Sequence, residues 1–317
     1  QNQSSAASDV YKRQIRKSAL SRLGFDHKTF VKYNDKIITA FAVGFSSDGP
    51  YRDLPAYDDI IQAASGMASY QEAYSDQPSY TSGATADKAT GLMLALSVVS
   101  SLFKRNKDNK DLEVEVPMFE TMVDFTLVEH LYGYNFLPPK DEPVYPRQSS
   151  PNRKPYETKD GFIAVLPYND EQWLRFLKFI KKEHLIKTKK FSTLENRNKN
   201  VDELYSLLVK ELKKEKTNFW IKKLREIDIP SMKINKPKDL FIDEHLKKTN
   251  FFKTYKHSTE GDLMYPRLPV YFNNERDNES KFEAPNLGNK TKEILIDLGY
   301  DKNEIENLRK EKVIFFE

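Results

Sequence analysis

The sequence predicts an α/β protein with two domains, and three observations indicate this class. At 317 residues the chain is longer than a usual single domain. Two strand-loop-helix units follow one another in its first half. A stretch with six prolines at 138–160 then precedes a strand and several amphipathic helices. We therefore expect a first segment at 15–137, a linker at 138–160, a smaller α+β domain at 161–258 and a C-terminal segment at 259–317.

The leader, residues 1–14, fits neither domain. "QNQSSAASDVYKRQ" has no initiating Met, no apolar h-region and no periodicity, so it is neither a signal peptide nor a plausible first element. We expect this leader to be non-native, and we expect the true upstream residues to be missing.

The first strand-loop-helix unit starts with "IITAFAV", Ile37 to Val43, a continuous apolar run that is typical of a buried parallel strand. The Gly- and Pro-rich loop "GFSSDGPYRDLPAYD" follows, and then a helix in which apolar residues recur at helical spacing: Ile60, Ile61, Ala64 and Met67. Loops at the carboxyl ends of parallel strands line the ligand crevice of open α/β sheets. We expect a site at this loop.

The second unit begins with a long apolar helix from Asp87 to Phe103. Apolar residues occur on both sides of it, so we expect it to be mostly buried. "DLEVEV" alternates like a half-exposed strand, and the next helix opens at Pro117 and stops near Gly133.

The smaller domain is expected to begin with the strand "GFIAVLP" and the helix "DEQWLRFLKFI". Amphipathic helices are predicted around Asp202 to Lys213 and Asn218 to Glu226. Short strands near "GDLMYPRLPVYF" and the terminal helices "NKTKEILIDLG" and "DKNEIENLRKE" complete the chain.

Composition narrows the function classes. The 51 Lys and Arg are interleaved with 47 Asp and Glu, which is a weak nucleic-acid signal. Cysteine is absent, and no apolar run approaches the roughly 20 residues of a membrane span. We expect a cytoplasmic protein that binds neither nucleic acid nor a membrane. The five histidines lack metal-ligand spacing, so no metal site is expected.

Two features keep alternatives open. Asp87 stands before a long apolar helix, where an Asp is most often an N-cap. The same position suits a nucleophile, because free N–H groups and the positive end of the helix dipole stabilise an oxyanion. The lysine clusters "FIKKEHLIKTKKF" and "KKEKTNFWIKK" are typical of solvated helix faces, with a basic binding module as the alternative.

Several long stretches, taken in order, resemble the class III coenzyme A transferases, the CaiB/BaiF family. They are "ALSRLGFDHKTFVKYNDKIITAFAVGFSSDGPYRDLPAYDDIIQAASG", "ADKATG", "VEVPMFETMVDFTLVEHL", "PYETKDGFIAVLPYNDEQW" and "LGNKTKEILIDLGY". The resemblance covers nearly everything after Ile15. It implies a Rossmann-like large domain built from the N- and C-terminal parts, a small middle domain and an interlocked homodimer.

The resemblance also implies an enzyme that moves CoA from an acyl-CoA donor to a carboxylic acid, with both as substrates and no permanently bound cofactor. Asp87 in "ADKATG" occupies the position of the family's nucleophile, which carries a covalent aspartyl intermediate. Tyr57 and Asp58 in "LPAYDDIIQ" are implied to line the active site. Relatives that racemise α-methylacyl-CoA place His at the position of Tyr57, so a racemase or epimerase is the alternative.

Coenzyme A contacts are implied for "ALSRLG", namely Ala19, Arg22 and Leu23. Arg22 is suited to meet a phosphate, and an ordinary surface Arg is its alternative. Pro55 stands where some relatives place a CoA-binding Lys, and it cannot supply that charged contact. "PRQSSPNRKPYETKDG" does not match the glycine-rich lid of the formyl-CoA branch, so the sequence does not support formate or oxalate as substrates.

Overall fold

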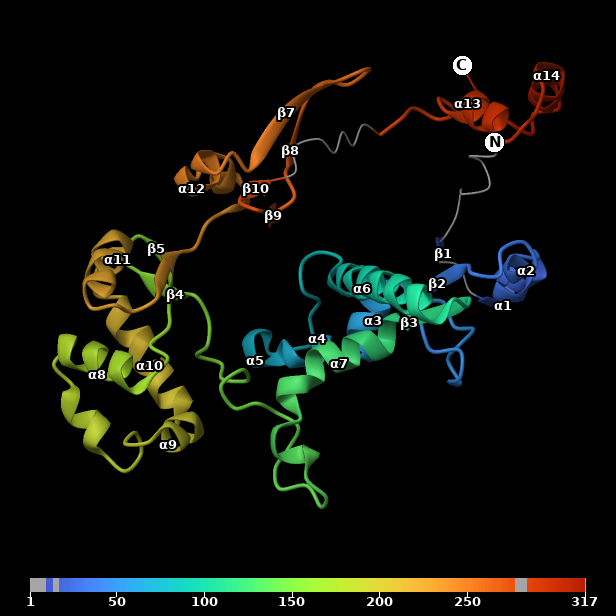
Figure 1. The fold of residues 1–317 in the computed structure, drawn as a ribbon. Coiled ribbons are helices and arrows are strands. Elements are labelled where there is room, and N and C mark those ends of the chain that lie inside the picture. The colour runs from blue at the N-terminus through green and yellow to red at the C-terminus, as the bar shows by residue number, and fades with distance from the viewer. Residues whose placement is uncertain (1–9, 14–16, 277–283, 317) are drawn as a thin grey trace. The chain divides into compact units, whose positions relative to one another are not determined.

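The computed structural model of the chain describes residues 10–13, 17–276 and 284–316 (Figure 1). Contacts divide the chain into two compact units, one spanning Ser8–Ile234 and the other running from Asn235 to the C-terminus. The finer division into residues 15–137, 138–160, 161–258 and 259–317 stays a prediction.

A parallel sheet in the order β1-β2-β3 organises the first half of the larger unit. Its strands are Val10–Arg13, Ile38–Val43 and Leu112–Pro117. Val10 pairs with Ile38 and Ile38 with Leu112, so β2 lies between two parallel neighbours and is buried along its whole length. The prediction of this buried strand is confirmed.

The expectation that residues 1–14 contribute no element is wrong for Val10–Arg13. These residues pair with β2 as an edge strand, although their sequence shows no alternation that marks a strand. Main-chain hydrogen bonding to a strand that is already buried does not need an apolar pattern in the partner. That the leader is non-native stays a prediction.

Helices join the three strands. The short helices α1 (Lys17–Arg22) and α2 (His27–Val31) precede β2, and the helices α3 (Asp58–Ala64), α4 (Met67–Tyr70) and α5 (Glu72–Ser75) follow it. The long helix α6 (Thr85–Asp108) leads to β3, after which α7 (Met118–His130) and a 3-10 turn (Tyr132–Asn135) end the segment. Figure 1 shows α6 beside β3 and α7, and α6 packs on both β2 and β3.

The helix predicted through Ile60 and Met67 is interrupted. Its backbone leaves the helix at Ser65 and Gly66, and Gly66 adopts a left-handed conformation with φ of 81°. Glycine takes this conformation without the steric cost that a Cβ would add, so the chain breaks here and Met67 opens α4.

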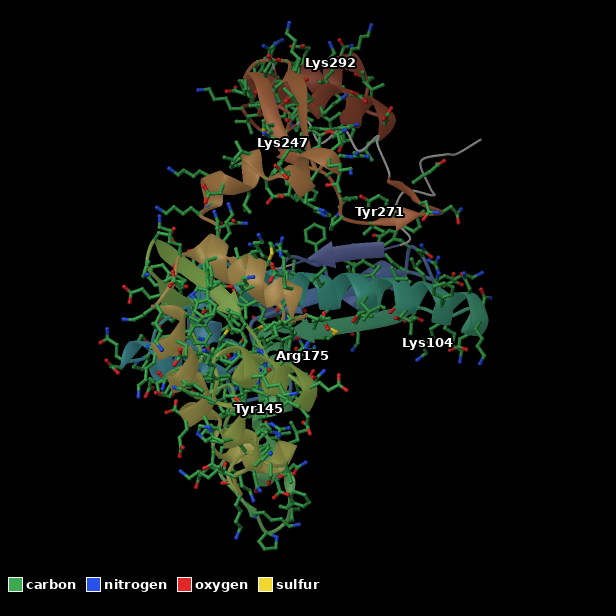
Figure 2. The ribbon with its side chains drawn as sticks, turned by 90° about the vertical axis from the view of Figure 1, so that its left-hand side faces the viewer. Lys104, Tyr145, Arg175, Lys247, Tyr271 and Lys292 are labelled. Atoms are coloured by element: carbon green, nitrogen blue, oxygen red, sulfur yellow. The ribbon has the colours of Figure 1, made fainter. Side chains whose placement is uncertain are left out.

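Helix α6 is less buried than its apolar sequence predicts. Its buried residues form one stripe, Ala86, Thr90, Leu94 and Ser101, whereas Leu92, Leu96 and Phe103 are exposed by more than half. Figure 2 shows side chains of its last turns, Lys104 among them, projecting away from the ribbon. The prediction of a mostly buried helix is wrong, because β2, β3, α3 and α7 pack against α6 and bury only this stripe.

The same helix is long and apolar enough to cross a membrane by length and composition alone. The 18-residue window that meets this test has a mean hydropathy of 1.3, and 22% of it is buried. This differs from the expectation that no stretch approaches such a length. One helix of this kind is weak evidence for a membrane span, because core helices of soluble proteins pass the same test.

The second half of the larger unit is an antiparallel sheet in the order β4-β5-β6 covered by helices. The strands are Tyr156–Thr158, Gly161–Val165 and Ser231–Lys233. The helices are α8 (Asp170–Phe179), α9 (Leu194–Lys199), α10 (Val201–Leu212) and α11 (Thr217–Glu226), with a 3-10 turn at Glu183–Lys187. The predicted strand and amphipathic helices of this region are confirmed.

This sheet and its helices enclose a large apolar core. Ile163, Phe176, Leu208 and Leu224 are fully buried in it. Lys178 of α8, Lys210 of α10 and Lys222 of α11 are exposed, and Lys182, which follows α8, pairs with Glu211 at 3.0 Å. These clusters therefore match the predicted solvated faces.

The smaller unit contains a β-hairpin and short helices. Strands β7 (Phe252–His257) and β8 (Gly261–Pro266) are antiparallel, as are β9 (Tyr271–Phe272) and β10 (Glu275–Arg276). A 3-10 turn (Pro237–Ile242) and α12 (Glu244–Lys248) precede them, and α13 (Thr291–Asp297) and α14 (Lys302–Lys310) follow. The two predicted terminal helices are confirmed.

Candidate active site

Asp87 lies in the first turn of α6 and not at its N-cap. The helix begins at Thr85 after the N-cap residue Ala84, whose side chain makes no capping hydrogen bond. The interpretation of Asp87 as an N-cap is therefore wrong, since its position is the third of the helix. Its side chain is exposed, so a substrate in solution can reach the carboxylate.

Asp58 connects the start of α3 to the start of α6. Its Oδ1 accepts a hydrogen bond from the backbone N–H of Asp87 at 3.0 Å, and its Oδ2 accepts one from the Gln62 side chain at 2.6 Å. The Gln62 Oε1 in turn accepts from the backbone N–H of Thr81 at 2.9 Å and from its hydroxyl at 3.1 Å. Asp58 thus supplies the acceptor that the N-cap of α6 does not.

Fewer backbone N–H groups are free at this turn than the sequence predicts. The Asp87 N–H donates to Asp58, and the Thr85 N–H donates to the carbonyl of Gly83 at 2.9 Å. The helix dipole still places partial positive charge beside the Asp87 carboxylate, because α6 has 24 residues and its axis starts here.

Apolar packing beneath the two acids holds them in place. Phe45, Ile61, Ala86 and Met122 form one buried cluster drawn from α3, α6, α7 and the loop that follows β2. Ala86 and Ile61 are both fully buried and stand next to or near the two acids in sequence. The core therefore fixes the approach of α3 to α6 at the point where Asp58 meets Asp87.

Tyr57 and Pro55 lie in the loop that leads into α3. Tyr57 is the N-cap residue of α3, is 77% exposed and makes no capping hydrogen bond. Pro55 is also exposed. The structure brings together Asp58 and Asp87 by a direct hydrogen bond, with Tyr57 adjacent to Asp58 along the chain.

Gly44 allows this loop to fold back on itself. A Cβ at Gly44 would lie 2.4 Å from the Cβ of Ala56, well inside van der Waals contact. The two ends of the loop can approach each other this closely only because residue 44 has no side chain.

A cavity of about 590 Å³ lies beside α1 and the end of β2. Lys17, Ser18 and Arg52 contribute polar groups to its wall, and Leu20, Phe41 and Val43 contribute apolar ones. Its size is within the range of small-molecule sites. The loop that lines it through Arg52 and Asp53 continues to Pro55, Tyr57 and Asp58.

Two of the predicted CoA contacts, Ala19 and Arg22, belong to α1, and Leu23 directly follows its last residue. Ala19 is half-buried, Arg22 and Leu23 are exposed, and none of the three lines this cavity. The residues of α1 that do line it are Lys17, Ser18, Leu20 and Ser21. CoA contact by Ala19, Arg22, Leu23 and Pro55 stays a prediction.

An ionic network closes one side of this cavity. The Lys17 ammonium lies 2.7 Å from both Glu113 and Glu115, and the Glu115 carboxylate also accepts hydrogen bonds from the backbone N–H and hydroxyl of Ser47. Burial acts to raise the pKa of Glu115, but the bonds from Lys17 and Ser47 outweigh it, and the pKa is lowered. The network ties β3 and the loop after β2 to the start of α1.

Within residues 10–13, 17–276 and 284–316, no group of three or more His, Cys, Asp or Glu side chains is arranged to hold a metal ion.

The sequence did not point to Gln62, which is fully buried and orients Asp58. Its spacing of four residues from Asp58 on one helix was the available signal.

Comparisons with known proteins agree on one family. A model of CoA-transferase family III matches residues 5–291. The chain is 27% identical to (R)-2-hydroxy-4-methylpentanoate CoA-transferase of Clostridioides difficile, over 96% of this chain and 77% of that protein. It is 27% identical to cinnamoyl-CoA:phenyllactate CoA-transferase of Clostridium sporogenes, over 98% of this chain and 76% of that protein.

A solved structure has the same fold. The crystal structure of a CAIB/BAIF family protein from Brucella suis superimposes with a TM-score of 0.72 and 23% identity, over 93% of this chain and 76% of that one. The chain therefore belongs to CoA-transferase family III. The family predicted from the sequence stretches is confirmed.

Proposed function

We propose that the protein transfers coenzyme A from an acyl-CoA donor to a carboxylic acid, with Asp87 as the nucleophile. Family membership and relatives that transfer CoA to hydroxy acids support the reaction. The observation that carries the role of Asp87 is its place: an exposed carboxylate at the positive end of a long helix, held there by Asp58.

The reaction proceeds as a series of acyl substitutions, each at a single carbonyl carbon. The Asp87 carboxylate attacks the carbonyl carbon of the thioester, and the CoA thiolate leaves to give a mixed anhydride. The thiolate attacks the aspartyl carbonyl and displaces the donor acid as its carboxylate, which leaves an aspartyl-CoA thioester. The acceptor carboxylate attacks this thioester and expels the thiolate again. The thiolate then attacks the acceptor's carbonyl, which forms the new acyl-CoA and restores Asp87.

The chain's own groups serve these steps in two ways. The hydrogen bond from the Asp87 N–H to Asp58 fixes the first turn of α6, so the carboxylate stays in one position through repeated attack. The partial positive charge of the helix N-terminus stabilises the negative charge that develops on each tetrahedral intermediate. Tyr57 and Asp58 line this site in the proposal.

The proposal extends to fold and assembly. The parallel sheet and its helices belong to a Rossmann-like large domain that the C-terminal segment completes, and the functional form is the interlocked homodimer that the family resemblance implies.

A transfer assay tests this function. Asp87→Ala should lower kcat/KM for CoA transfer by at least about 10³-fold, because the nucleophile is lost. Asp59→Ala is the matched control, since Asp59 is an exposed acid one residue from Asp58, and it should retain activity. Normal turnover by Asp87→Ala would refute the role of Asp87. Exchange of the α-proton in deuterated water without CoA transfer would select the racemase alternative.

A further inference from the structure

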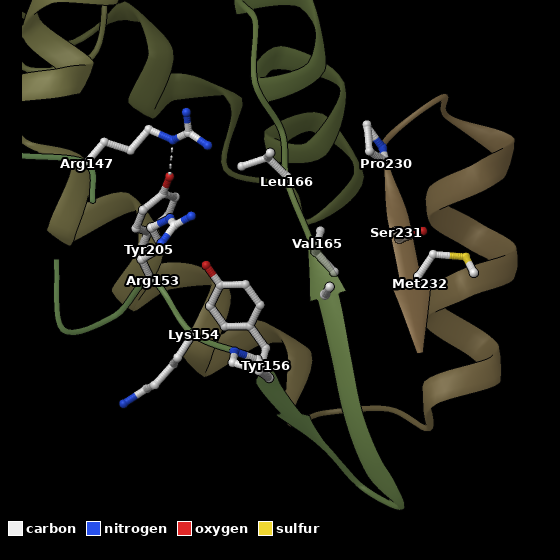
Figure 3. Close-up of a pocket in the computed structure, with 12 residues that line it drawn as sticks. Arg147, Arg153, Lys154, Tyr156, Val165, Leu166, Tyr205, Pro230, Ser231 and Met232 are labelled. Atoms are coloured by element: carbon white, nitrogen blue, oxygen red, sulfur yellow. Dashed lines mark hydrogen bonds between the residues drawn. The ribbon is translucent and has the colours of Figure 1, made fainter. Parts of the chain in front are cut away.

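A second cavity, of about 450 Å³, lies in the half of the larger unit that contains β4, β5 and β6. Figure 3 shows the residues that line it. Three of them carry a positive charge, Arg147, Arg153 and Lys154, and none of the described residues in the wall is acidic. A wall with cations and no acids favours a negatively charged ligand.

The three cations are not neutralised by their surroundings. Among the described residues, none of them forms an ion pair with a carboxylate. The Arg147 Nε donates to the hydroxyl of Tyr205 at 3.2 Å, which orients the guanidinium in the cavity wall. Asp202, an acid that contacts this loop, accepts its hydrogen bonds from the neutral donors Ser150 and Asn152.

The loop that carries the cations is held in one conformation. Asp202 accepts hydrogen bonds from Ser150 at 2.7 Å and from the side chain of Asn152 at 2.9 Å. Arg153 donates to the Tyr74 hydroxyl at 3.1 Å, and that hydroxyl donates to the carbonyl of Gln148. Fixing a loop before binding reduces the entropy that a ligand must overcome.

The rest of the wall divides into a polar and an apolar side. In Figure 3 the hydroxyl of Tyr156 points toward Tyr205 and the arginines, and both tyrosines are more than nine-tenths buried. Val165, Leu166 and Met232 stand on the other side of the view. Burial raises the pKa of Tyr156, with Tyr205 acting in the same direction and Arg153 against it, so the hydroxyl stays a donor at neutral pH.

We propose that this cavity binds an organic carboxylate, with Arg147 and Arg153 meeting the carboxylate group and Val165, Leu166 and Met232 covering an apolar body. Arginine pairs well with a carboxylate because its planar donors match the two oxygens. A bare phosphate ion would leave the apolar wall exposed to water, which favours an acid with a hydrocarbon or aromatic part. The proposal does not depend on the role of Asp87, since none of these residues belongs to that site.

Isothermal titration of the full chain with 3-phenylpropanoate tests the proposal. We expect saturable binding of one molecule per chain, and at least tenfold weaker binding of the neutral amide, 3-phenylpropanamide. Arg147→Gln and Arg153→Gln should each weaken binding of the acid at least tenfold. Lys189→Gln removes a charge from an exposed position away from the cavity and should leave binding unchanged.

Further measurements separate the remaining interpretations. Arg147→Lys keeps the charge and checks against loss of folding, so its circular dichroism should match the wild type while its affinity falls. Asp87→Asn should bind the acid as tightly as wild type, and loss of binding in this variant would place the acid at the other site and overturn the proposal. Equal affinities for acid and amide, unchanged binding in both Gln variants, or inorganic phosphate binding as tightly as the acid would also overturn it.

Discussion

The carboxylate of Asp58 accepts a hydrogen bond from the backbone N–H of Asp87, with the two atoms 3.0 Å apart. The residues are 29 positions apart in the sequence and lie in the first turns of two different helices. The contact means that one predicted site residue holds the turn on which another one stands. Stability and activity of the protein should therefore respond together when Asp58 is changed.

Asp58→Ala should destabilise the protein by about 1 kcal/mol, the usual cost of losing a capping acceptor at a helix start. It should also lower CoA-transfer activity, because the Asp87 carboxylate then samples more positions. Urea unfolding and the transfer assay measure the two effects. Asp59→Ala, which removes a neighbouring exposed acid, should change neither. A fully stable, fully active Asp58→Ala protein would show that the hydrogen bond positions nothing.

Gln62→Leu should cost about 1–3 kcal/mol of unfolding free energy, because Oδ2 of Asp58 and the N–H of Thr81 lose their partner in a buried place. Leucine has a similar size, so the loss comes from hydrogen bonding more than from packing. Chemical denaturation measures it. Gln62→Glu keeps one acceptor for Thr81 but sets a second carboxylate against Asp58, so it should also destabilise. A Gln62→Leu protein as stable as wild type would contradict the network.

Gly44→Ala should destabilise the protein by about 1–3 kcal/mol, because the new methyl group would overlap the Cβ of Ala56. Gly91 provides the opposite case, since it lies inside α6 and a Cβ there meets nothing within 4 Å. Gly91→Ala should stabilise by about 0.5–1 kcal/mol through helix propensity. Thermal unfolding of both variants gives the comparison. Changes of the same sign at the two positions would argue against the close loop.

The contribution of Glu115 to stability should depend on pH. Its folded-state pKa is lowered below the ordinary Glu value of 4.5, so its contribution to stability is present above pH 4.5 and is lost as the pH falls through the folded-state pKa. The melting temperature of the wild type should drop on acidification below 4.5 by more than that of Glu115→Gln. Scanning calorimetry between pH 3.5 and 7 checks this. Parallel curves for both proteins would mean that the pair with Lys17 is not formed in solution.

Strong local patterns allowed much of the fold to be predicted. Ile37–Val43 could be predicted as a buried strand because Thr39 is its single polar residue. In the structure Thr39 is buried as well. The amphipathic helices α8, α10 and α11 were readable because their apolar residues follow the helical period around one core.

Features that depend on contacts between residues far apart in the chain could not be predicted from the sequence. Periodicity shows that α6 has apolar residues on two sides, but it does not show that one side, with Leu92 and Phe103, is left exposed. The sequence placed Asp58 and Asp87 in one site only through the family resemblance, because spacing carries no information on residues so far apart. From the sequence alone Gln62 would be expected at the surface, whereas in the structure it is buried and hydrogen-bonded to Asp58. CoA contact by Ala19, Arg22 and Leu23 stays a prediction, since none of the three lines the cavity beside α1.

Mass spectrometry of the protein after incubation with an acyl-CoA substrate tests the central claim most directly. The proposed mechanism predicts a covalent adduct on the peptide that contains Asp87, which hydroxylamine converts to a hydroxamate at that residue and which is missing from Asp87→Asn. Transfer activity without any adduct on Asp87, or the same adduct on another carboxylate in both proteins, would contradict the mechanism.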